Sequence, residues 1–311
     1  MKKNYLIVVL ILIFILFILT HPAIATTAAA DGLLLWYEQI LPALLPMAIL
    51  SNLMVYSNYM QIVTKYLHPL AKRLMPTSSN GCFAFFGGIF FGFPMGSKIS
   101  AELTSEHRIS KAEGEILATC FNQLSPVFIS NYLLTYILDM PKFILPSYII
   151  LYTPPFLYAS WKLRRLHPVN EKNTASDSHL NFGIIDAGIM NGFESLTKLG
   201  GYIILFSIFA AMLHTFNTDY PAVNLVCTGI IEVTTGISYL KDSSLPPESI
   251  YALAMFFVSF GGLCGFAQTC SMTGECSFSR LHYLCCRILF GIASSVNGYI
   301  FYLLFGCRIL G

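Results

Sequence analysis

Charge is what this sequence has least of. Only 11% of its 311 residues are charged, against roughly 25% in soluble domains, while 55% are hydrophobic and the mean hydropathy is +0.66. A water-soluble fold is therefore not expected, and the chain is predicted to be an integral membrane protein surrounded by the lipid bilayer. The net charge of +2 comes from basic residues that are spread among polar loops. Nucleic acid is not expected as a partner, because the sequence gathers no basic patch.

The sequence also lacks the strings that mark catalysis and metal binding. It has no HExxH, GxSxG or Walker string, and no carboxylates paired at helical spacing within an apolar run. No enzymatic activity, catalytic residue or cofactor is therefore predicted. The nine cysteines form no CxxC pair and have no histidine at zinc-ligand spacing. No metal site is predicted, and most cysteines are interpreted as small apolar side chains between helices.

The most unusual stretch, residues 87–98, reads GGIFFGFPMGSK and interrupts a hydrophobic run. Its four glycines lower helix propensity, Pro94 removes a backbone donor, and Lys98 would bring its charge into hydrocarbon. Non-helical backbone at membrane depth persists only where protein or a water-filled cavity surrounds it. Residues 80–104 are therefore predicted to form a re-entrant hairpin. Its tip is expected to contribute to a site for a small-molecule substrate, as broken helices do in secondary transporters.

Residues 1–25 are expected to act as an N-terminal signal anchor or signal peptide. The apolar run at 4–20 follows Lys2 and Lys3 and precedes HPAIATTAAA, so retention and cleavage after Ala25 both fit the sequence. We favour the uncut anchor, because the run is long for a signal peptide and nearly long enough to span a bilayer. Either outcome places residue 26 outside.

The fold class predicted for the whole chain is an all-α membrane protein. We expect about six transmembrane helices plus two re-entrant helical hairpins in inverted repeats, the second hairpin lying at 250–279. Segments 59–75 and 222–240 either span the bilayer or lie at its interface, and the sequence leaves this open. The six spans are predicted at 4–20, 33–57, 112–138 (interrupted at NQLSP, 122–126), 143–161, 186–213 and 282–306.

The basic residues support this topology. The positive-inside rule places lysine and arginine in cytoplasmic loops, and it favours both termini in the cytoplasm if the N-terminal segment is not cleaved. The side assigned to the cytoplasm holds Lys2, Lys3, Lys65, Lys72, Arg73, Arg108, Lys111, Lys162, Arg164, Arg165, Lys172 and Arg308, and the other side holds Lys142, Lys241 and Arg280.

The two halves of the chain resemble each other weakly, so the similarity is either a true repeat or chance in an apolar chain. We favour a repeat over 30–162 and 183–311, with a cytoplasmic linker at 163–182. Three spans separate the copies, which are therefore expected to face opposite ways. At a shift of 156, Gly32, Tyr37, Glu38 and Ser51 match Gly188, Phe193, Glu194 and Ser207, and at a shift of 174 Gly87-Gly88 matches Gly261-Gly262.

Two hairpin tips meeting two interrupted helices would expose backbone N–H and C=O groups near the middle of the bilayer. Such groups bind an anion, a polar ring or a coupling ion. The simpler interpretation is that small residues here only let helices pack closely, and that Lys98 reaches the inner interface. The predicted substrate-binding residues are Gly92, Phe93, Pro94, Met95, Gly96, Ser97, Lys98, Asn122, Ser125, Pro126, Glu232, Thr234, Thr235, Gly265, Gln268, Ser271 and Met272.

These motifs resemble those of a known family. GFPMGSKISAEL, then NQLSP, EVTTG and GGLCGFAQTCSM, are similar to the sporulation integral membrane protein family called YlbJ or SpoVV. That family carries two nucleoside-recognition (Gate) segments, which also occur in concentrative nucleoside transporters and in FeoB-type iron transporters. The resemblance covers the chain from about residue 30 onward. It implies a protein of the outer forespore membrane that moves dipicolinic acid during spore maturation, with Lys98 as a sensible partner for its carboxylates.

Three functions remain in competition. We favour a secondary carrier of a small anionic or nucleoside-like solute. A metal-ion gate of the ferrous-iron type is kept open by Cys264, Cys270 and Cys276 near the second predicted hairpin, although soft-ligand spacing is absent. A non-transporting sporulation assembly protein is the third, because fold does not fix function. The sequence leaves the coupling ion and the oligomeric state open, and a homo-oligomer is compatible with it.

Overall fold

The computed structural model describes residues 2–166, 180–216 and 221–306, and within them every regular element is a helix. Four helical segments are long and apolar enough to cross a membrane. An all-α membrane protein is thus confirmed at this level. The four segments are Pro22–Tyr56, Phe182–Thr215, Pro247–Met272 and Arg280–Gly306.

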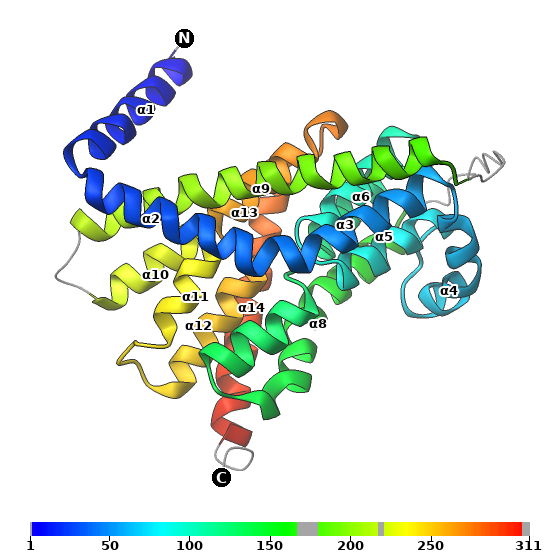
Figure 1. Cartoon of the computed structure of the whole chain (residues 1–311). Helices are drawn as coiled ribbons and strands as arrows, with labels where there is room; N and C mark the ends of the chain where they lie inside the picture. The colour runs from blue at the N-terminus through cyan, green and yellow to red at the C-terminus, as the bar shows by residue number, and fades with distance from the viewer. Residues whose placement is uncertain (1, 167–179, 217–220, 307–311) are drawn as a thin grey trace.

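Two long helical segments pack side by side across one face of the molecule and run in opposite directions (Figure 1). The span predicted at 33–57 begins earlier than expected, because the alanine-rich residues before it are strong helix formers and Pro22 suits a first helical turn. α1 stands apart at one end of the bundle (Figure 1). The elements are α1 (Lys2–Thr20), then α2 (Pro22–Leu35), η1 (Trp36–Ile40) and α3 (Leu41–Tyr56) as one segment, and α9 (Phe182–Phe216).

The remaining helices form two sets beneath these long segments (Figure 1). Each set contains a pair of short helices packed side by side, then an interrupted helix, then a closing helix. The first set is α4 (Met60–Leu74), α5 (Ser79–Phe90), α6 (Met95–Ser105), α7 (Lys111–Cys120), η2 (Phe128–Ile137), η3 (Pro141–Phe143) and α8 (Ile144–Leu163). The second is α10 (Pro221–Ile231), α11 (Val233–Leu240), α12 (Pro247–Phe260), α13 (Gly262–Met272), η4 (Gly274–Cys276), α14 (Arg280–Phe301) and η5 (Tyr302–Gly306).

The first set follows the sequence-based expectation closely. α5 and α6 pack against each other on either side of a turn at 91–94, within the region predicted as a hairpin. The interruption predicted at NQLSP separates α7 from η2. Gly92 in the turn has φ of 76°, a left-handed conformation that favours glycine. The predicted linker at 163–182 falls largely on residues 167–179, which lie outside the described part of the chain.

The second set differs from expectation. Residues 250–279 do not fold back as a pair; α12 is followed across Gly261 by α13, and the two continue toward opposite ends of the bundle (Figure 1). The helices that pack side by side are instead α10 and α11, within the segment at 222–240. Gly261 and Gly262 have φ of 83° and 71°, which interrupts the helix, and α13 continues beyond them. The predicted match of Gly87-Gly88 to Gly261-Gly262 therefore joins positions with different roles.

The last helix, α14, therefore runs in the direction opposite to the one predicted. α14 begins beside the start of α7 and the end of α8, where His282 Nδ1 lies 3.2 Å from Glu115 Oε1 and a 2.7 Å hydrogen bond joins His282 to Tyr158. It ends at the other end of the bundle, where the Tyr302 and Phe143 rings are 5.7 Å apart. Arg280 therefore lies at the same end as Lys111, contrary to its predicted side. We call this the basic end; Arg308 lies outside the described residues.

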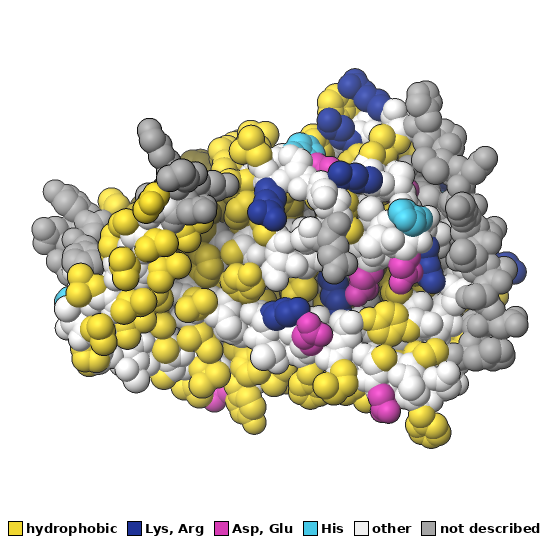
Figure 2. Space-filling model, turned by 90° about the horizontal axis from the view of Figure 1, so that it is seen from above, with side chains coloured by type: hydrophobic (Ala, Val, Ile, Leu, Met, Phe, Trp, Pro, Cys, Tyr) yellow, Lys and Arg dark blue, Asp and Glu magenta, His cyan; other side chains and the backbone are white. Residues whose placement is uncertain are grey.

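The charge distribution agrees with a molecule that has one polar end. Figure 2 shows charged side chains gathered toward the end at which α9 begins, whereas much of the visible surface beyond them is hydrophobic. The exposed lysine and arginine side chains of α4 belong to this basic end, where α4 packs on α5. The helix predicted at 59–75 is therefore present as α4. Which side of a membrane the basic end faces stays a prediction.

Candidate functional site

A cavity of about 860 Å³ lies where the interruptions of the helices meet. We call it the central chamber. Its wall combines the α2–α3 segment, the α5–α6 turn and the α7–η2 interruption from the first set with the α10–α11 turn, the α12–α13 interruption and α14 from the second. Its volume falls in the range of small-molecule sites, roughly 300–1,000 Å³. Both sets of helices are therefore needed to form it.

Seven of the predicted site residues line this chamber, and they come from four separate stretches of the chain. The other ten lie behind its wall or away from it. The lining residues among those predicted are Phe93, Asn122, Ser125, Glu232, Thr234, Gly265 and Gln268, and the residues outside the lining are Gly92, Pro94, Met95, Gly96, Ser97, Lys98, Pro126, Thr235, Ser271 and Met272.

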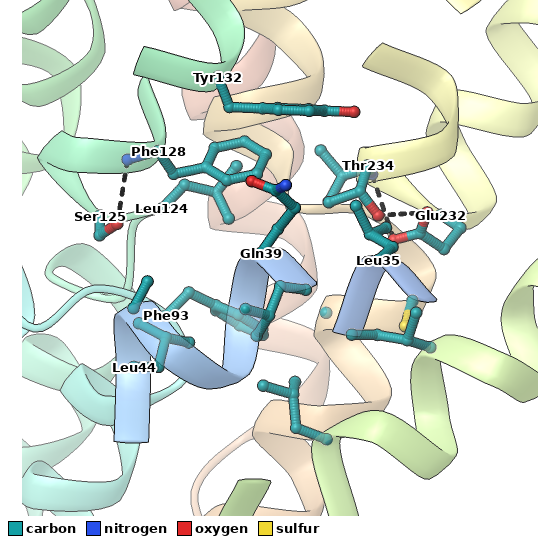
Figure 3. Close-up of a pocket in the computed structure, with 18 of the residues that line it drawn as sticks. Leu35, Gln39, Leu44, Phe93, Leu124, Ser125, Phe128, Tyr132, Glu232 and Thr234 are labelled. Carbon is teal, nitrogen blue, oxygen red and sulfur yellow. Dashed lines mark hydrogen bonds between the residues drawn. The ribbon is translucent and has the colours of Figure 1, made fainter. Parts of the chain in front are cut away.

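One wall of the chamber is aromatic. Phe128 and Tyr132 lie on η2 with ring centroids 4.9 Å apart, and Phe93 faces the chamber from the α5–α6 turn (Figure 3). Ser125 Oγ accepts a 3.2 Å hydrogen bond from the Phe128 N–H group, which fixes the start of this helix (Figure 3). Gln39 projects its amide between the two walls (Figure 3). The wall suits a planar ring flanked by polar groups.

Glu232 occupies the opposite wall (Figure 3) and is 2% exposed. It precedes α11 as the N-cap, and its carboxylate accepts hydrogen bonds from the N–H groups of Thr234 at 3.2 Å and Thr235 at 2.6 Å. The hydroxyl groups of the same threonines donate at 2.6 and 2.7 Å. The sequence EVTT therefore supplies both a helix cap and its four donors. The negative charge of Glu232 is satisfied by its own chain.

Asn122 connects the two sets of helices behind the chamber wall. Its Oδ1 accepts a 3.2 Å hydrogen bond from the N–H group of Ser97 in the first turn of α6. Its Nδ2 donates to Thr269 Oγ1 at 3.0 Å and to the Tyr283 hydroxyl at 3.2 Å. One asparagine thus joins the α5–α6 turn to α13 and α14. Asn122 is buried, and each of its polar atoms has a partner.

Arg287 also lines the chamber, although it is not among the site residues predicted from the sequence. It lies on α14, is 1% exposed, and lines the cavity. Its Nε donates to the Phe260 carbonyl oxygen at 3.2 Å, whereas its Nη1 has no hydrogen-bond partner. Among the described residues no carboxylate lies within 4.0 Å of its guanidinium. The sequence signal for it is a single arginine inside the apolar run YLCCRILFG, residues 283–291, because an ionisable residue within a membrane is a functional candidate by default.

Lys98 lies away from the chamber, contrary to the prediction that it binds substrate there. It sits one turn into α6 on the side facing α3 and α9, where its Nζ donates to Asn52 Oδ1 at 3.1 Å and to Asn191 Oδ1. Glu102 Oε1 lies 3.6 Å from the same nitrogen. Asn191 in turn donates to the Tyr56 hydroxyl at 2.6 Å. Lys98 therefore holds the first helix pair against the long helices.

In the part of the chain that the structure describes, no three side chains of histidine, cysteine, aspartate or glutamate are placed to hold a metal ion. Of the three cysteines noted for the iron alternative, Cys264 lines the chamber, while Cys270 and Cys276 do not. Cys276 Sγ donates instead to the Ala101 carbonyl oxygen at 3.1 Å. The cysteines of this region thus occupy different environments.

The chain is similar to the sporulation integral membrane protein YlbJ of Bacillus subtilis (strain 168). The two are 24% identical over an alignment of 318 positions that covers 90% of this chain and 78% of the relative. No protein-family model matches the chain, and no solved structure matches it. This similarity over most of the chain agrees with the motifs that first suggested a resemblance to the YlbJ family of sporulation integral membrane proteins.

Proposed function

We propose that the protein is a secondary carrier that moves a small anionic solute, dipicolinic acid, across a membrane of the developing spore. The observation that carries this proposal is the central chamber, a cavity of about 860 Å³ formed where two helix turns and two interrupted helices converge. Interrupted helices that meet around a cavity are the usual substrate site of secondary transporters. The role of the relative in sporulation, given by its name, is consistent with this membrane and this solute.

The two sets of helices would act as inverted repeats with one re-entrant pair each. The first members of the pairs, Ser79–Phe90 and Pro221–Ile231, have 12 and 11 residues, or about 16–18 Å at 1.5 Å per residue, too short for a hydrocarbon core of about 30 Å. The pairs open toward opposite ends of the bundle. Six crossings then remain in the repeats: α2–α3, α7–η2, α8, α9, α12–α13 and α14, with α1 as a further apolar helix.

Contacts between the long helices support a repeat related by a two-fold axis. In the match at a shift of 156, Gly32 corresponds to Gly188 and Ser51 to Ser207. In the structure Gly32 lies against Ser207, and Gly188 lies against Leu53, two residues from Ser51. The second contact lies two residues from the one that an exact two-fold relation would give, so the two contacts match such a relation approximately. Alternating access would then arise from movement of the short helix pairs against the long helices.

The chamber suits dipicolinate in shape and polarity. Dipicolinate is a planar pyridine ring with two carboxylates, and the wall offers the neighbouring rings of Phe128 and Tyr132 with polar groups on the other sides. Two acidic residues of the wall, Asp31 and Glu38, are exposed, and the third, Glu232, is already satisfied. Among the described residues of the wall, the buried charge that is left partly unpaired is therefore the positive charge of Arg287.

Uptake of labelled dipicolinate into liposomes containing the purified full chain tests the proposal. Gly265→Phe would fill the chamber, because even a methyl group there would lie 3.3 Å from the Phe93 ring. Gly201→Phe is the matched control: Gly201 is exposed on α9 and has open space beside it. We expect uptake by the wild type and by Gly201→Phe at several-fold above empty liposomes, and loss of uptake in Gly265→Phe.

The same assay separates the alternatives. Uptake of uridine but not dipicolinate would indicate a nucleoside carrier, and movement of ferrous iron alone would indicate a metal-ion gate. If folded protein moves none of these, the carrier proposal is wrong. An assembly role would then be tested in spores that lack the protein, because external dipicolinate should not rescue a defect of assembly, whereas it should rescue a defect of transport.

A further inference from the structure

Four helices begin close to the central chamber, and three of them have a first-turn N–H group occupied by an oxygen atom of the chain itself. Asn122 Oδ1 accepts from the first turn of α6, Ser125 Oγ from the start of η2, and the Glu232 carboxylate from α11. The fourth helix, α13, follows Gly261 and has no side-chain cap. Free N–H groups and the helix dipole make such a start attractive to an anion.

Arg287 stands beside this uncapped helix start. Its Nη2 is the nearest atom to the position that a methyl group at Gly261 would occupy, at 3.3 Å, and its Nε is bonded to the Phe260 carbonyl oxygen. The guanidinium is thus anchored at the junction of α12 and α13. Nη1 is left without a partner although the side chain is 99% buried. A buried charged donor without an acceptor is costly unless a ligand supplies one.

The surroundings do not neutralise this charge. Tyr283 lies one turn before Arg287 on α14, and its hydroxyl group accepts hydrogen bonds from Asn122 and Thr269. Glu232 is held by its own helix start, and no described carboxylate lies within 4.0 Å of the arginine. The chamber therefore offers two positive features side by side, a guanidinium whose Nη1 has no acceptor and a helix N-terminus without a side-chain cap.

We propose that Arg287 and the first N–H groups of α13 form a carboxylate-binding subsite of the chamber, so that the protein selects solutes by an acidic group attached to an aromatic ring. This inference rests on the carrier function proposed above and adds the residues that recognise charge. Guanidinium binds carboxylate through two parallel hydrogen bonds, and a helix start adds backbone donors without a second charged side chain. Phe128 and Tyr132 on the aromatic wall would then hold the ring.

Titration calorimetry on the purified full chain in detergent tests the subsite with three probes that share one ring. The probes are pyridine-2,6-dicarboxylate, pyridine-2-carboxylate and the uncharged pyridine-2,6-dicarboxamide. We expect the wild type to bind the dicarboxylate at least about tenfold more tightly than the dicarboxamide, the difference that a charged hydrogen bond contributes. Arg287→Gln should weaken dicarboxylate binding about 10- to 100-fold and change dicarboxamide binding less than about threefold.

Two variants keep the result decisive. Arg280→Gln removes an exposed arginine from the first residue of the same helix and should leave all three affinities unchanged. Arg287→Lys keeps the charge but loses the planar fork, so we expect an intermediate loss for the dicarboxylate. If Arg287→Gln does not fold, the wild-type preference decides, because equal binding of dicarboxylate and dicarboxamide overturns the subsite.

Different results would contradict the carrier function and the carboxylate-binding subsite. A wild type that binds none of the probes and moves no dipicolinate contradicts the carrier function itself. If the wild type moves dipicolinate and Arg287→Gln binds dipicolinate as tightly as the wild type does, only the subsite is contradicted.

Discussion

Among the described residues, two basic side chains, Lys98 and Arg287, are buried to a comparable depth but in opposite circumstances. Lys98 is 6% exposed and has three oxygen partners, Asn52, Asn191 and Glu102. Arg287 is 1% exposed, has one backbone partner, and faces a cavity with part of its guanidinium unpaired. A satisfied buried charge holds helices together, whereas an unsatisfied one is costly in the absence of a ligand. The contrast separates a structural cation from a recognition cation.

Replacement of Lys98 is expected to have the largest effect on stability. Lys98→Met would leave the two asparagine oxygens without a donor and the Glu102 carboxylate without its cation. We expect the free energy of unfolding, measured in mixed detergent micelles, to fall by about 3 kcal/mol. Dipicolinate affinity of the folded fraction should be unchanged, because Lys98 does not line the chamber.

Lys198→Met is the matched control for this prediction. Lys198 pairs with Glu194 four residues away on α9, at 2.6 Å, but both side chains are more than half exposed. Exposed pairs of this kind contribute little, so its removal should not change stability measurably. A loss of dipicolinate affinity in Lys98→Met equal to that in Arg287→Gln would break the comparison, because Lys98 would then belong to the site.

Glu232 gives the next largest effect and tests whether the chamber contains a linked pair of opposite charges. Glu232→Ala removes the acceptor of four hydrogen bonds at the start of α11, so we expect the free energy of unfolding to fall by about 2 kcal/mol. Glu38→Ala, at an exposed chamber residue, should leave it unchanged. Dipicolinate affinity should not fall in Glu232→Gln; a loss as large as that in Arg287→Gln would mean that the two charges act together.

Arg287 itself should give a smaller change in stability, of opposite sign. Arg287→Met replaces a partly unpaired buried charge with an apolar side chain, and such replacements are often stabilising. We expect the free energy of unfolding to rise by roughly 1.5 kcal/mol in unfolding titrations without ligand, while dipicolinate binding is lost. A marked loss of stability would show that Arg287 has a structural role like that of Lys98.

The first helix pair and the first interruption could be predicted because the sequence marks them with residues that break helices. Gly92 and Pro94 lie at the turn between α5 and α6, and the NQLSP string separates α7 from η2. The second set carries its marks differently. A single polar residue, Glu232, stands at the turn between α10 and α11, whereas the conspicuous glycines at 261–262 only interrupt a helix. Composition locates a break, but packing decides whether the chain reverses there.

Chamber residues could be predicted where they lie at helix breaks, but not where they lie within a continuous helix. Phe93 and Asn122 line the chamber because they lie at the breaks themselves, which sequence can locate. Lys98 is only four residues beyond Pro94, yet one helical turn rotates it toward α3 and α9. Arg287 lies on an uninterrupted helix, and its importance depends on partners that it lacks. Sequence gives the position of a charge along the chain, and the fold gives its partners.

The smallest expected effect comes from a change that moves the guanidinium of Arg287 without removing it. Gly261→Ala would place a methyl group 3.3 Å from Arg287 Nη2, at a residue whose φ of 83° disfavours any side chain. We expect the free energy of unfolding to fall by about 1 kcal/mol and dipicolinate affinity to fall a few-fold, measured by the same calorimetry. Gly274→Ala, which has open space and no left-handed conformation, is the control and should change neither. If Gly261→Ala weakens the dicarboxamide as much as the dicarboxylate, the methyl group acts on the shape of the chamber and not on the arginine, and the recognition role of Arg287 loses its positional support.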